Sequence, residues 1–313
     1  MSFQEKCMEL KQILNFDVDI FTAIIIGLAA QRPVRIHTHH PDVVEKCALV
    51  VAANILGYDQ RLLYRCDADA DVDHFLNGVS DWRESGQTDK QLMPFLILRN
   101  VASLSNECQA LLLEVLQTGK TTYRGVTYSK PPGFLLLSVS KNDVYMFEYL
   151  RDEFFVYHEC HVDSEVNIGQ LIESISEERT ASPPLMTAAD IKMLHDKASK
   201  VSIVAELQRY MQDIIVHIRC HRVVARAIKP KAARDFTLFV RHMCVLNDSD
   251  FATPSVIAVA ARKLLPSSVH IASPEFEPSL AYGSDYKLIE EYITSWDGAL
   301  VVEDVLNRVK APV

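Results

Sequence analysis

The chain has 313 residues, 49% of them hydrophobic, and a formal net charge of −9 at neutral pH. Its length allows a substantial core in one large or two medium domains, and its acidic balance argues against broad non-specific binding of nucleic acid. The densest apolar run, Phe21–Ala30, is about half of a membrane span. The seven scattered cysteines form no C-x-x-C pair, which favours reduced thiols. We expect a globular protein of the cytoplasm or nucleus without a membrane segment.

The first part of the chain alternates helical and extended patterns. Residues 1–30 have a helical pattern, Val34–Thr38 is a short strand, and Pro41–Leu56 is a helix with proline at its first position. Leu62–Cys66 is a candidate second strand. The stretch Asp67–Asp89 is acidic and polar apart from Phe75, Leu76 and Trp82. We expect the aspartate run at its start, Asp67 to Asp73, to be a solvated loop.

The most informative stretch is Phe95–Ser140. It contains two continuously apolar runs, Phe95–Leu98 and Phe134–Val139, which are typical of parallel strands covered on both faces. Between them lie a helix that Ser105 caps and a hairpin at Tyr123–Tyr128. A strand, a helix and a second strand in this order predict an open α/β sheet.

The second part of the chain is predicted to be helical. A capping box at Thr187–Asp190 opens one helix, Val201–Arg219 has an apolar helical face, and a further helix begins at Thr253. These patterns divide the chain into an α/β core at 1–165, a linker at 166–186, a helical domain at 187–270 and a C-terminal helical tail at 271–313.

Three motifs of the central stretch carry a resemblance to a known family. The helix Gln109–Leu116 has the form Gln-x-x-Leu-Leu-Glu-x-Leu, the hairpin contains Gly125–Tyr128, and Pro131–Phe134 leads into the second strand. Together they resemble the core of the magnesium chelatase and MoxR clade of AAA+ ATPases. The resemblance implies an α/β fold with an AAA+-like parallel sheet flanked by helices, followed by a small all-α lid domain.

The positions that carry the chemistry of that clade are altered. A P-loop needs glycines and a lysine around the phosphates, whereas the loop at Thr38–Glu45 has no glycine. The Asp-Glu pair that serves magnesium and the attacking water is replaced by Arg99 and Asn100. The arginine that would complete a neighbour's site is replaced by Glu153. The residues of this degenerate nucleotide site are Thr38, His39, His40, Val44, Lys46, Arg99, Asn100, Asn142 and Lys231.

These substitutions predict a pseudo-ATPase without catalytic residues and without a cofactor. An atypical site that binds ATP with Mg²⁺ is the alternative. No metal site is expected either, because the zinc-donor types at His37, His39, His40 and Cys47 lack a second ligand pair with zinc spacing.

One local concentration of positive charge lies at residues 219–234. Its cations are Arg219, Arg222, Arg226, Lys229, Lys231 and Arg234. This segment could contact nucleic acid, an acidic partner or a residual nucleotide. It contains no aromatic side chain for base stacking, and a solvated helix end is the commoner meaning of such a run.

A second and narrower resemblance begins near Leu207. Its matches are Arg209-Tyr210, Asp213-Ile214, His217, Arg219, His221-Arg222, Tyr282–Asp285, Val301-Val302, Val305-Leu306 and Pro312-Val313. They are similar to the fungal maintenance of telomere capping protein 2 family. The resemblance implies a link to telomere capping and no established chemistry.

Three functions follow as hypotheses. The first is an interaction or assembly module with an AAA+ fold, without catalysis, in telomere capping or maintenance. The second is a magnesium chelatase-like ATPase subunit with an atypical nucleotide site. The third is nucleic-acid binding through residues 219–234. The sequence leaves the protein partner unidentified and an oligomer open.

Overall fold

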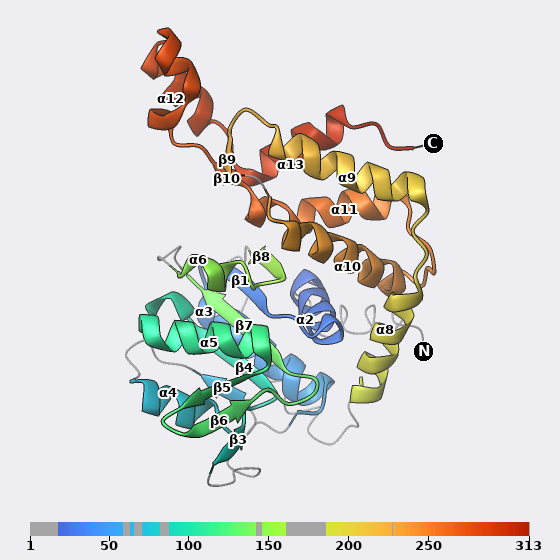
Figure 1. The fold of residues 1–313 in the computed structure, drawn as a ribbon. Coiled ribbons are helices and arrows are strands. Elements are labelled where there is room, and N and C mark those ends of the chain that lie inside the picture. The colour runs from blue at the N-terminus through green and yellow to red at the C-terminus, as the bar shows by residue number, and fades with distance from the viewer. Residues whose placement is uncertain are drawn as a thin grey trace. The chain divides into compact units, whose positions relative to one another are not determined.

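The computed structural model describes residues 18–58, 63–65, 71–81, 88–141, 146–160, 186–226 and 228–312. It divides into two compact units, Met1–His195 and Asp196–Val313 (Figure 1). The helical prediction for residues 1–17 and most of the expected linker, residues 166–185, lie outside the described residues. In the described part of the chain, no helix combines the length and the apolar character that crossing a membrane requires.

The first unit is built on a five-stranded sheet in which every pairing is parallel. In spatial order its strands are β2 (Leu63–Arg65), β4 (Phe95–Arg99), β7 (Leu135–Ser140), β1 (Val34–Thr38) and β8 (Val156–Cys160). All six residues of the central strand β7 are buried, as the continuous apolar run predicted for a strand covered on both faces. The expectation of a parallel sheet is confirmed.

Helices and a small second sheet surround these strands. Helix α2 (Val18–Ala30) packs on β1, β7 and β8, and α3 (Pro41–Val50) packs on β1, β4 and β7 before continuing as a π-helical turn at Val51–Ile55. Helix α5 (Asn106–Thr118) begins where Ser105 accepts a hydrogen bond from the Cys108 N–H at 3.2 Å. The unit also contains the strands β3 (Asp89–Gln91), β5 (Lys120–Tyr123) and β6 (Val126–Ser129), and the short helix α6 (Glu148–Arg151).

The acidic and polar stretch Asp67–Asp89 contains a helix that was not predicted from the sequence, and this helix includes Asp73 from the expected solvated loop. Residues Val72–Val79 form helix α4, which Asp71 caps by accepting a hydrogen bond from the Val72 N–H at 2.8 Å. The buried side chains are Val72, Phe75, Leu76 and Val79. Their spacing is that of one apolar helix face, and the surrounding acidic residues obscured this periodicity in the sequence.

The second unit is mainly helical. Its larger helices are α8 (Ala188–Lys200, which crosses the unit boundary), α9 (Ala205–Arg219), α10 (Pro230–Leu246), α11 (Pro254–Leu264) and α13 (Gly298–Arg308). The capping box predicted for the first of these is present, since the Asp190 carboxylate accepts from the Thr187 N–H at 2.8 Å. Helix α13, from the predicted tail, packs against α9 and α11.

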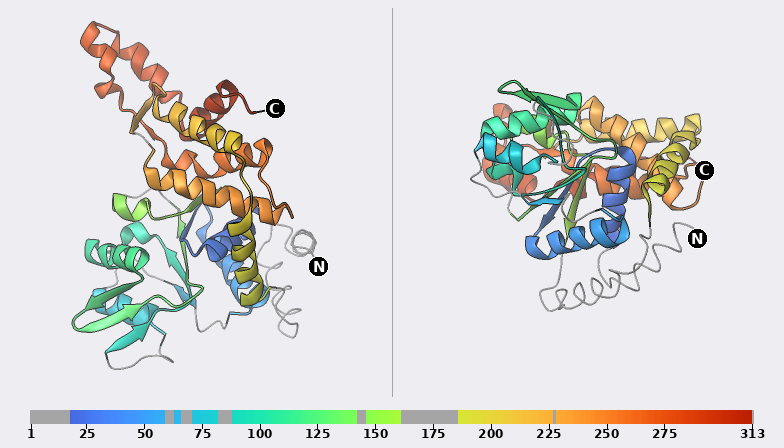
Figure 2. Two further views of the ribbon diagram at one scale, coloured as in Figure 1. Left: turned by 45° about the vertical axis from the view of Figure 1, so that its right-hand side comes forward. Right: turned by 90° about the horizontal axis from the view of Figure 1, so that it is seen from below.

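Two smaller features complete the second unit. Strands β9 (Val224–Arg226) and β10 (His270–Ile271) form a short antiparallel ladder. After it come the 3₁₀ turns η5 (Pro274–Phe276) and η6 (Pro278–Tyr282) and then α12 (Tyr286–Thr294). In Figures 1 and 2, α12 extends away from α9, α10 and α11 of the same unit.

Gly27 explains how closely α2 approaches the sheet. A Cβ atom at this position would lie 2.4 Å from Val34 Cγ2 and 3.0 Å from Leu135 Cδ1. Helix propensity alone would make Gly27→Ala stabilising by about 1 kcal/mol. We expect the opposite, a loss of about 1–3 kcal/mol in the free energy of unfolding of this unit, because the added methyl overpacks the α2–β1 contact. Urea denaturation of the two proteins measures the difference, and an unchanged or higher midpoint for the variant would contradict the close approach.

Candidate functional site

The candidate nucleotide site lies where β1 ends and α3 begins. Only His39 and His40 connect the two elements, and the segment Thr38–Glu45 has none of the glycines with which a P-loop wraps phosphate in its backbone N–H groups. The Thr38 hydroxyl accepts from the His40 N–H at 3.1 Å, and the Val43 and Val44 N–H groups both lie within hydrogen-bond distance of the His40 carbonyl. The N–H groups of His40, Val43 and Val44 are therefore used within the segment itself.

Arg99, at the end of β4, reaches this loop and pairs with two carboxylates of α3. Its Nη1 atom lies 2.5 Å from Asp42 Oδ1 and 3.9 Å from Glu45 Oε2. Glu45 is 2% exposed, so its charge depends on partners inside the protein. A nucleotide site of this fold has cations on the loop and carboxylates at the strand end. Here the carboxylates lie on the helix that follows the loop, and the cation lies at the strand end.

The structure thus brings Arg99 next to two residues of the Thr38–Glu45 segment, Asp42 and Glu45. Sequence reasoning missed Asp42 and Glu45 as members of the site. Their spacing of three places both on the same side of the start of α3, and that spacing was the available signal.

The other predicted site residues lie in different places in the structure. Asn100 has a left-handed backbone with φ of 52°, donates its N–H to the Val139 carbonyl and accepts from the Lys141 N–H at 3.5 Å, so it links the ends of β4 and β7. Val44 is fully buried, and Lys46 is exposed on α3. Asn142 lies outside the described residues. Lys231 is in the second unit, 4.0 Å from Asp235 one helical turn along α10.

Glu153, at the position of the missing arginine, belongs to the opposite edge of the sheet. It accepts from Gln117 Nε2 at 3.0 Å and lies 3.9 Å from Arg32. It lines a cavity of about 230 Å³ with Arg32, Lys130 and Phe134, which precede the starts of β1 and β7. Burial, helped by the nearby Arg32 charge, lowers the pKa of Lys130 while Glu153 opposes the shift. Ligands of open α/β sheets bind at the other edge, where the strands end.

Several cations of the basic segment have partners within the second unit. Arg219 donates Nε and Nη2 to the Ile228 carbonyl at 3.0 and 2.7 Å, which closes the loop before α10. Arg222 donates Nε and Nη2 to Glu277 Oε1 at 3.1 and 2.9 Å. Arg226 and Arg234 are exposed on β9 and α10, and Lys229 precedes α10. Some cations of the segment therefore stabilise the second unit through intramolecular contacts.

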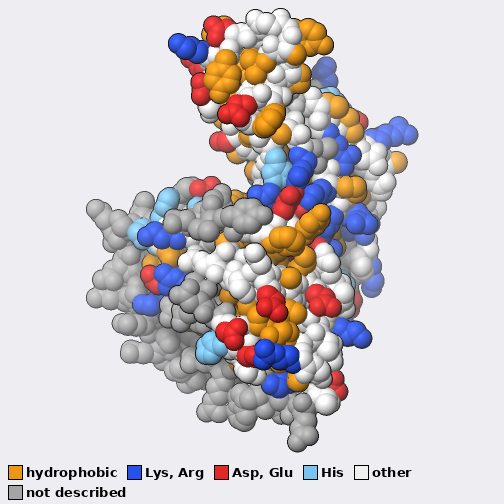
Figure 3. All heavy atoms as spheres, turned by 60° about the vertical axis from the view of Figure 1, so that its left-hand side comes forward, with side chains coloured by type: hydrophobic (Ala, Val, Ile, Leu, Met, Phe, Trp, Pro, Cys, Tyr) orange, Lys and Arg blue, Asp and Glu red, His pale blue; other side chains and the backbone are white. Residues whose placement is uncertain are grey.

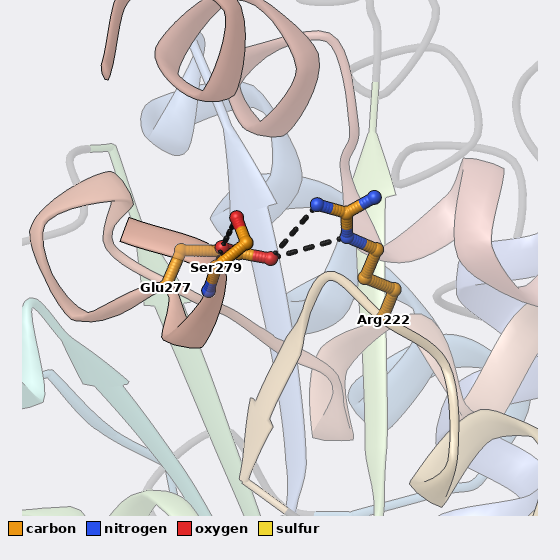
Figure 4. A network of polar contacts seen from close by, with 3 residues as sticks. All are labelled: Arg222, Glu277 and Ser279. Carbon is orange, nitrogen blue, oxygen red and sulfur yellow. Dashed lines mark hydrogen bonds and ion pairs between the residues drawn. The ribbon is translucent and has the colours of Figure 1, made fainter. Parts of the chain in front are cut away.

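The contact of Arg222 with Glu277 is the centre of a small polar network (Figure 4). Glu277 also accepts from the Ser279 N–H at 2.7 Å and from the Ser279 hydroxyl. The Ser279 hydroxyl first, and then Arg222, hold the pKa of Glu277 below its ordinary value. The Arg222 guanidinium also lies 5.3 Å from the ring centre of Tyr292 on α12.

His221 makes a second attachment to the C-terminal segment. Its Nε2 atom is 3.2 Å from Asp304 Oδ2 on α13, and its ring lies 4.9 Å from the ring of Trp296. His221 and Arg222 are thus two of the residues that suggested the narrower family, and the structure shows that both hold the C-terminal segment. Glu277, Trp296 and Asp304, the residues that receive them, were not identified from the sequence.

The fold is the AAA+-like parallel sheet flanked by helices that the sequence resemblance implied, and a mainly helical unit follows it. Over 99% of this chain and 98% of the other, the fold is similar to the crystal structure of a "putative ATPase" from Cytophaga hutchinsonii, with a TM-score of 0.68 and 14% identity. A full-length MCM homolog from Methanopyrus kandleri is also similar, with a TM-score of 0.54 and 9% identity over 86% of this chain and 61% of the other.

The curated relatives of the chain are yeast proteins named "Maintenance of telomere capping protein 2", which confirms the second resemblance. The relative in Vanderwaltozyma polyspora is 25% identical over 55% of this chain, and the one in Kluyveromyces lactis is 26% identical over 52%. In each case the chain spans 53% of the relative's length. The relative in Lachancea thermotolerans is 22% identical over 77% of this chain and 82% of its own length. No protein-family model matches the sequence.

The burial of Glu45 allows a test of the ion pairs at the sheet edge. We expect Arg99→Ala to lower the free energy of unfolding by about 1–3 kcal/mol, because a buried carboxylate loses part of its compensation. The matched control is Arg124→Ala, which removes another 2.5 Å contact, to Asp73, between side chains that are 70% and 45% exposed. That change should cost under about 1 kcal/mol. Urea denaturation measures both, and equal effects would show that the Arg99 contacts are no more than surface pairs.

The lowered pKa of Glu277 gives a pH dependence with a defined sign. A carboxyl group whose folded pKa lies below its unfolded value adds stability above the unfolded pKa and loses it as the pH falls through the folded pKa. The stability difference between the wild type and Glu277→Gln should therefore be constant above about pH 5 and shrink below about pH 4. The exposed Glu275→Gln is the matched control. A difference that grows on acidification would contradict the contacts with Ser279 and Arg222.

Proposed function

We propose that this protein is a catalytically degenerate member of the AAA+ fold class that acts as an interaction or assembly module. We place its role in telomere capping or maintenance, in the nucleus or the cytoplasm. The names of the yeast relatives support that setting. The activity and partners of the whole protein belong to this proposal, because the chain spans about half the length of the first two relatives it matches.

The observation that carries the proposal is the pairing of Arg99 with Asp42 and Glu45. Phosphoryl transfer depends almost entirely on positioned cations and a metal that neutralise the phosphate charge. Here the first two turns of α3 carry the Asp42 carboxylate and the buried Glu45 carboxylate near the place where phosphates would lie. The strand end carries a guanidinium that cannot ligate Mg²⁺. A nucleotide would have to displace an ion pair and would then face two like charges. Neither ATP nor Mg²⁺ is part of the proposed function.

The competing hypothesis is a magnesium chelatase-like ATPase with an atypical site. It would need Lys46 or Lys231 to replace the missing P-loop lysine. Lys46 follows the buried Glu45 on α3 and is exposed, and Lys231 lies near Asp235. Neither arrangement supplies the backbone N–H groups that a P-loop contributes.

Nucleic-acid binding through residues 219–234 is the third hypothesis. Arg219 and Arg222 are engaged with a carbonyl and a carboxylate of the second unit. Binding to phosphate would compete with these contacts, so fewer cations remain for the sequence-independent attraction on which such binding depends. The arrangement favours a protein partner over nucleic acid.

Calorimetric titration of the full chain with Mg²⁺ and ATP at millimolar concentration tests the proposal. We expect no saturable heat for the wild type, because the loop is too short and the charges have the wrong sign. The variants Lys46→Ala and Lys231→Ala should give the same flat titration. Saturable binding by the wild type that either substitution abolishes would refute the degenerate site and establish the atypical one.

A further inference from the structure

The projection formed by η5, η6 and α12 carries large apolar side chains that the second unit leaves exposed. Phe276 is 82% exposed, Tyr282 89% and Leu288 66%, and Tyr286 and Tyr292 are each 40% exposed. We call these five side chains the α12 face. A cluster of this kind on a folded unit marks an interaction site more often than the scattered apolar residues of an ordinary surface. Figure 3 shows hydrophobic and acidic side chains next to one another on the projection, at the top of the view.

The apolar stripe of α12 is wider than the part that its own unit covers. Ile289 and Ile293, one turn apart, are buried and attach the helix to its neighbours. Leu288 and Tyr292 have the same spacing and form a second row beside the first. This second row remains exposed, so α12 has the pattern of a helix with two contacting surfaces and one of them unpartnered.

Internal contacts hold the α12 face in place before anything binds. Arg222 bridges to Glu277 at the start of η6 and also lies against the ring of Tyr292. Asp285 caps α12 by accepting from the Lys287 N–H at 2.9 Å, and Trp296 packs against Tyr292 at 6.1 Å between ring centres. A pre-ordered surface loses little conformational entropy on binding, which favours association.

The charge around the face selects the class of partner. Residues 275–297 contain six carboxylates and one lysine, a net charge of −5. Glu275, Glu290 and Glu291 are exposed, and no side chain in the described part of the chain forms an ion pair with them. A nucleic acid or an anionic lipid surface would be repelled. A second copy of the same face would be repelled as well, since each copy brings the same negative charge.

We propose that the α12 face binds a cationic amphipathic segment of a partner protein. Apolar side chains at helical spacing would pack on Leu288 and the exposed aromatic residues, while lysine or arginine side chains would meet Glu290 and Glu291. This mode is the packing of an amphipathic helix against an apolar surface with complementary charge at its rim. It deepens the proposed function of an interaction module and rests on it, because it names the chemistry of the partner.

The test uses the full chain and a fluorescein-labelled peptide of about twenty residues, with lysines on one helical face and leucine and tryptophan on the other. Fluorescence anisotropy should show binding that weakens with salt and exceeds that of a scrambled peptide of equal composition. The triple variant Phe276→Ser/Tyr282→Ser/Leu288→Ser should bind at least about tenfold more weakly. All three side chains are exposed, so circular dichroism should show an unchanged fold.

Matched controls come from exposed positions elsewhere in the second unit. The triple variant Val204→Ser/Val216→Ser/Phe251→Ser removes side chains that are 56%, 49% and 56% exposed and should bind as the wild type does. For charge, Glu290→Gln/Glu291→Gln should weaken binding, whereas Glu206→Gln on α9 should not.

Four results would overturn the inference. The first two are an equal loss of peptide binding in both triple variants and equal binding of the scrambled peptide. The other two are a dimer in sedimentation equilibrium that only the α12-face variant abolishes, and flotation with phosphatidylserine vesicles that this variant abolishes. The last two would assign the face to a second copy or to a membrane. Failure of the peptide to bind, with a flat ATP titration, would remove this inference and leave the degenerate site intact. Saturable ATP binding would instead remove the proposed function.

Discussion

Arg99 joins the end of β4 to the beginning of α3, and the chemistry of the sheet edge depends on this contact. The start of a helix has unpaired N–H groups and a positive end of its dipole, which is why phosphates bind there in nucleotide-binding folds. In this protein the Asp42 carboxylate lies in the first turn of α3, and Arg99 balances it and the buried Glu45. The protein therefore supplies from its own side chains the negative charge that a ligand supplies elsewhere. In the proposed function, these side chains replace a nucleotide in balancing the charges at this edge of the sheet.

The short connection between β1 and α3 also supports the proposal that no nucleotide binds at this edge. With only His39 and His40 between the two elements, the chain passes directly from strand to helix. The hydrogen bonds from the Val43 and Val44 N–H groups to the His40 carbonyl use donors that a longer loop would direct at phosphate. In the proposed function, loop length and charge are two independent obstacles to nucleotide binding. Restoring a lysine or an acidic pair alone would leave the other obstacle in place.

The sequence predicted the strands and helices better than the side-chain contacts between them. Buried parallel strands are continuous apolar runs, so Phe95–Leu98 and Phe134–Val139 could be assigned without knowledge of their neighbours. Helix α4 was missed because acidic residues flank its four buried side chains, and composition was given more weight than periodicity. The substitution at Arg99 was visible in the sequence. Its pairing with Asp42, 57 residues away, was not, because long-range side-chain contacts follow from the packing of α3 on the sheet.

In the second unit too, the elements could be predicted from the sequence and the long-range side-chain contacts could not. This unit carries the proposed binding surface. His221 and Arg222 belong to the basic segment 219–234, whose charge alone left nucleic acid, an acidic partner and a nucleotide open as ligands. Their partners Asp304 and Glu277 lie 83 and 55 residues further along the chain, and these contacts change the meaning of the charges. Arg222 neutralises one carboxylate of an acidic projection and braces Tyr292, which leaves the rest of that projection negative and apolar. The proposed function therefore combines a core that works without a nucleotide with an acidic and apolar surface that would repel polyanions. This combination suits a protein that works by binding another protein.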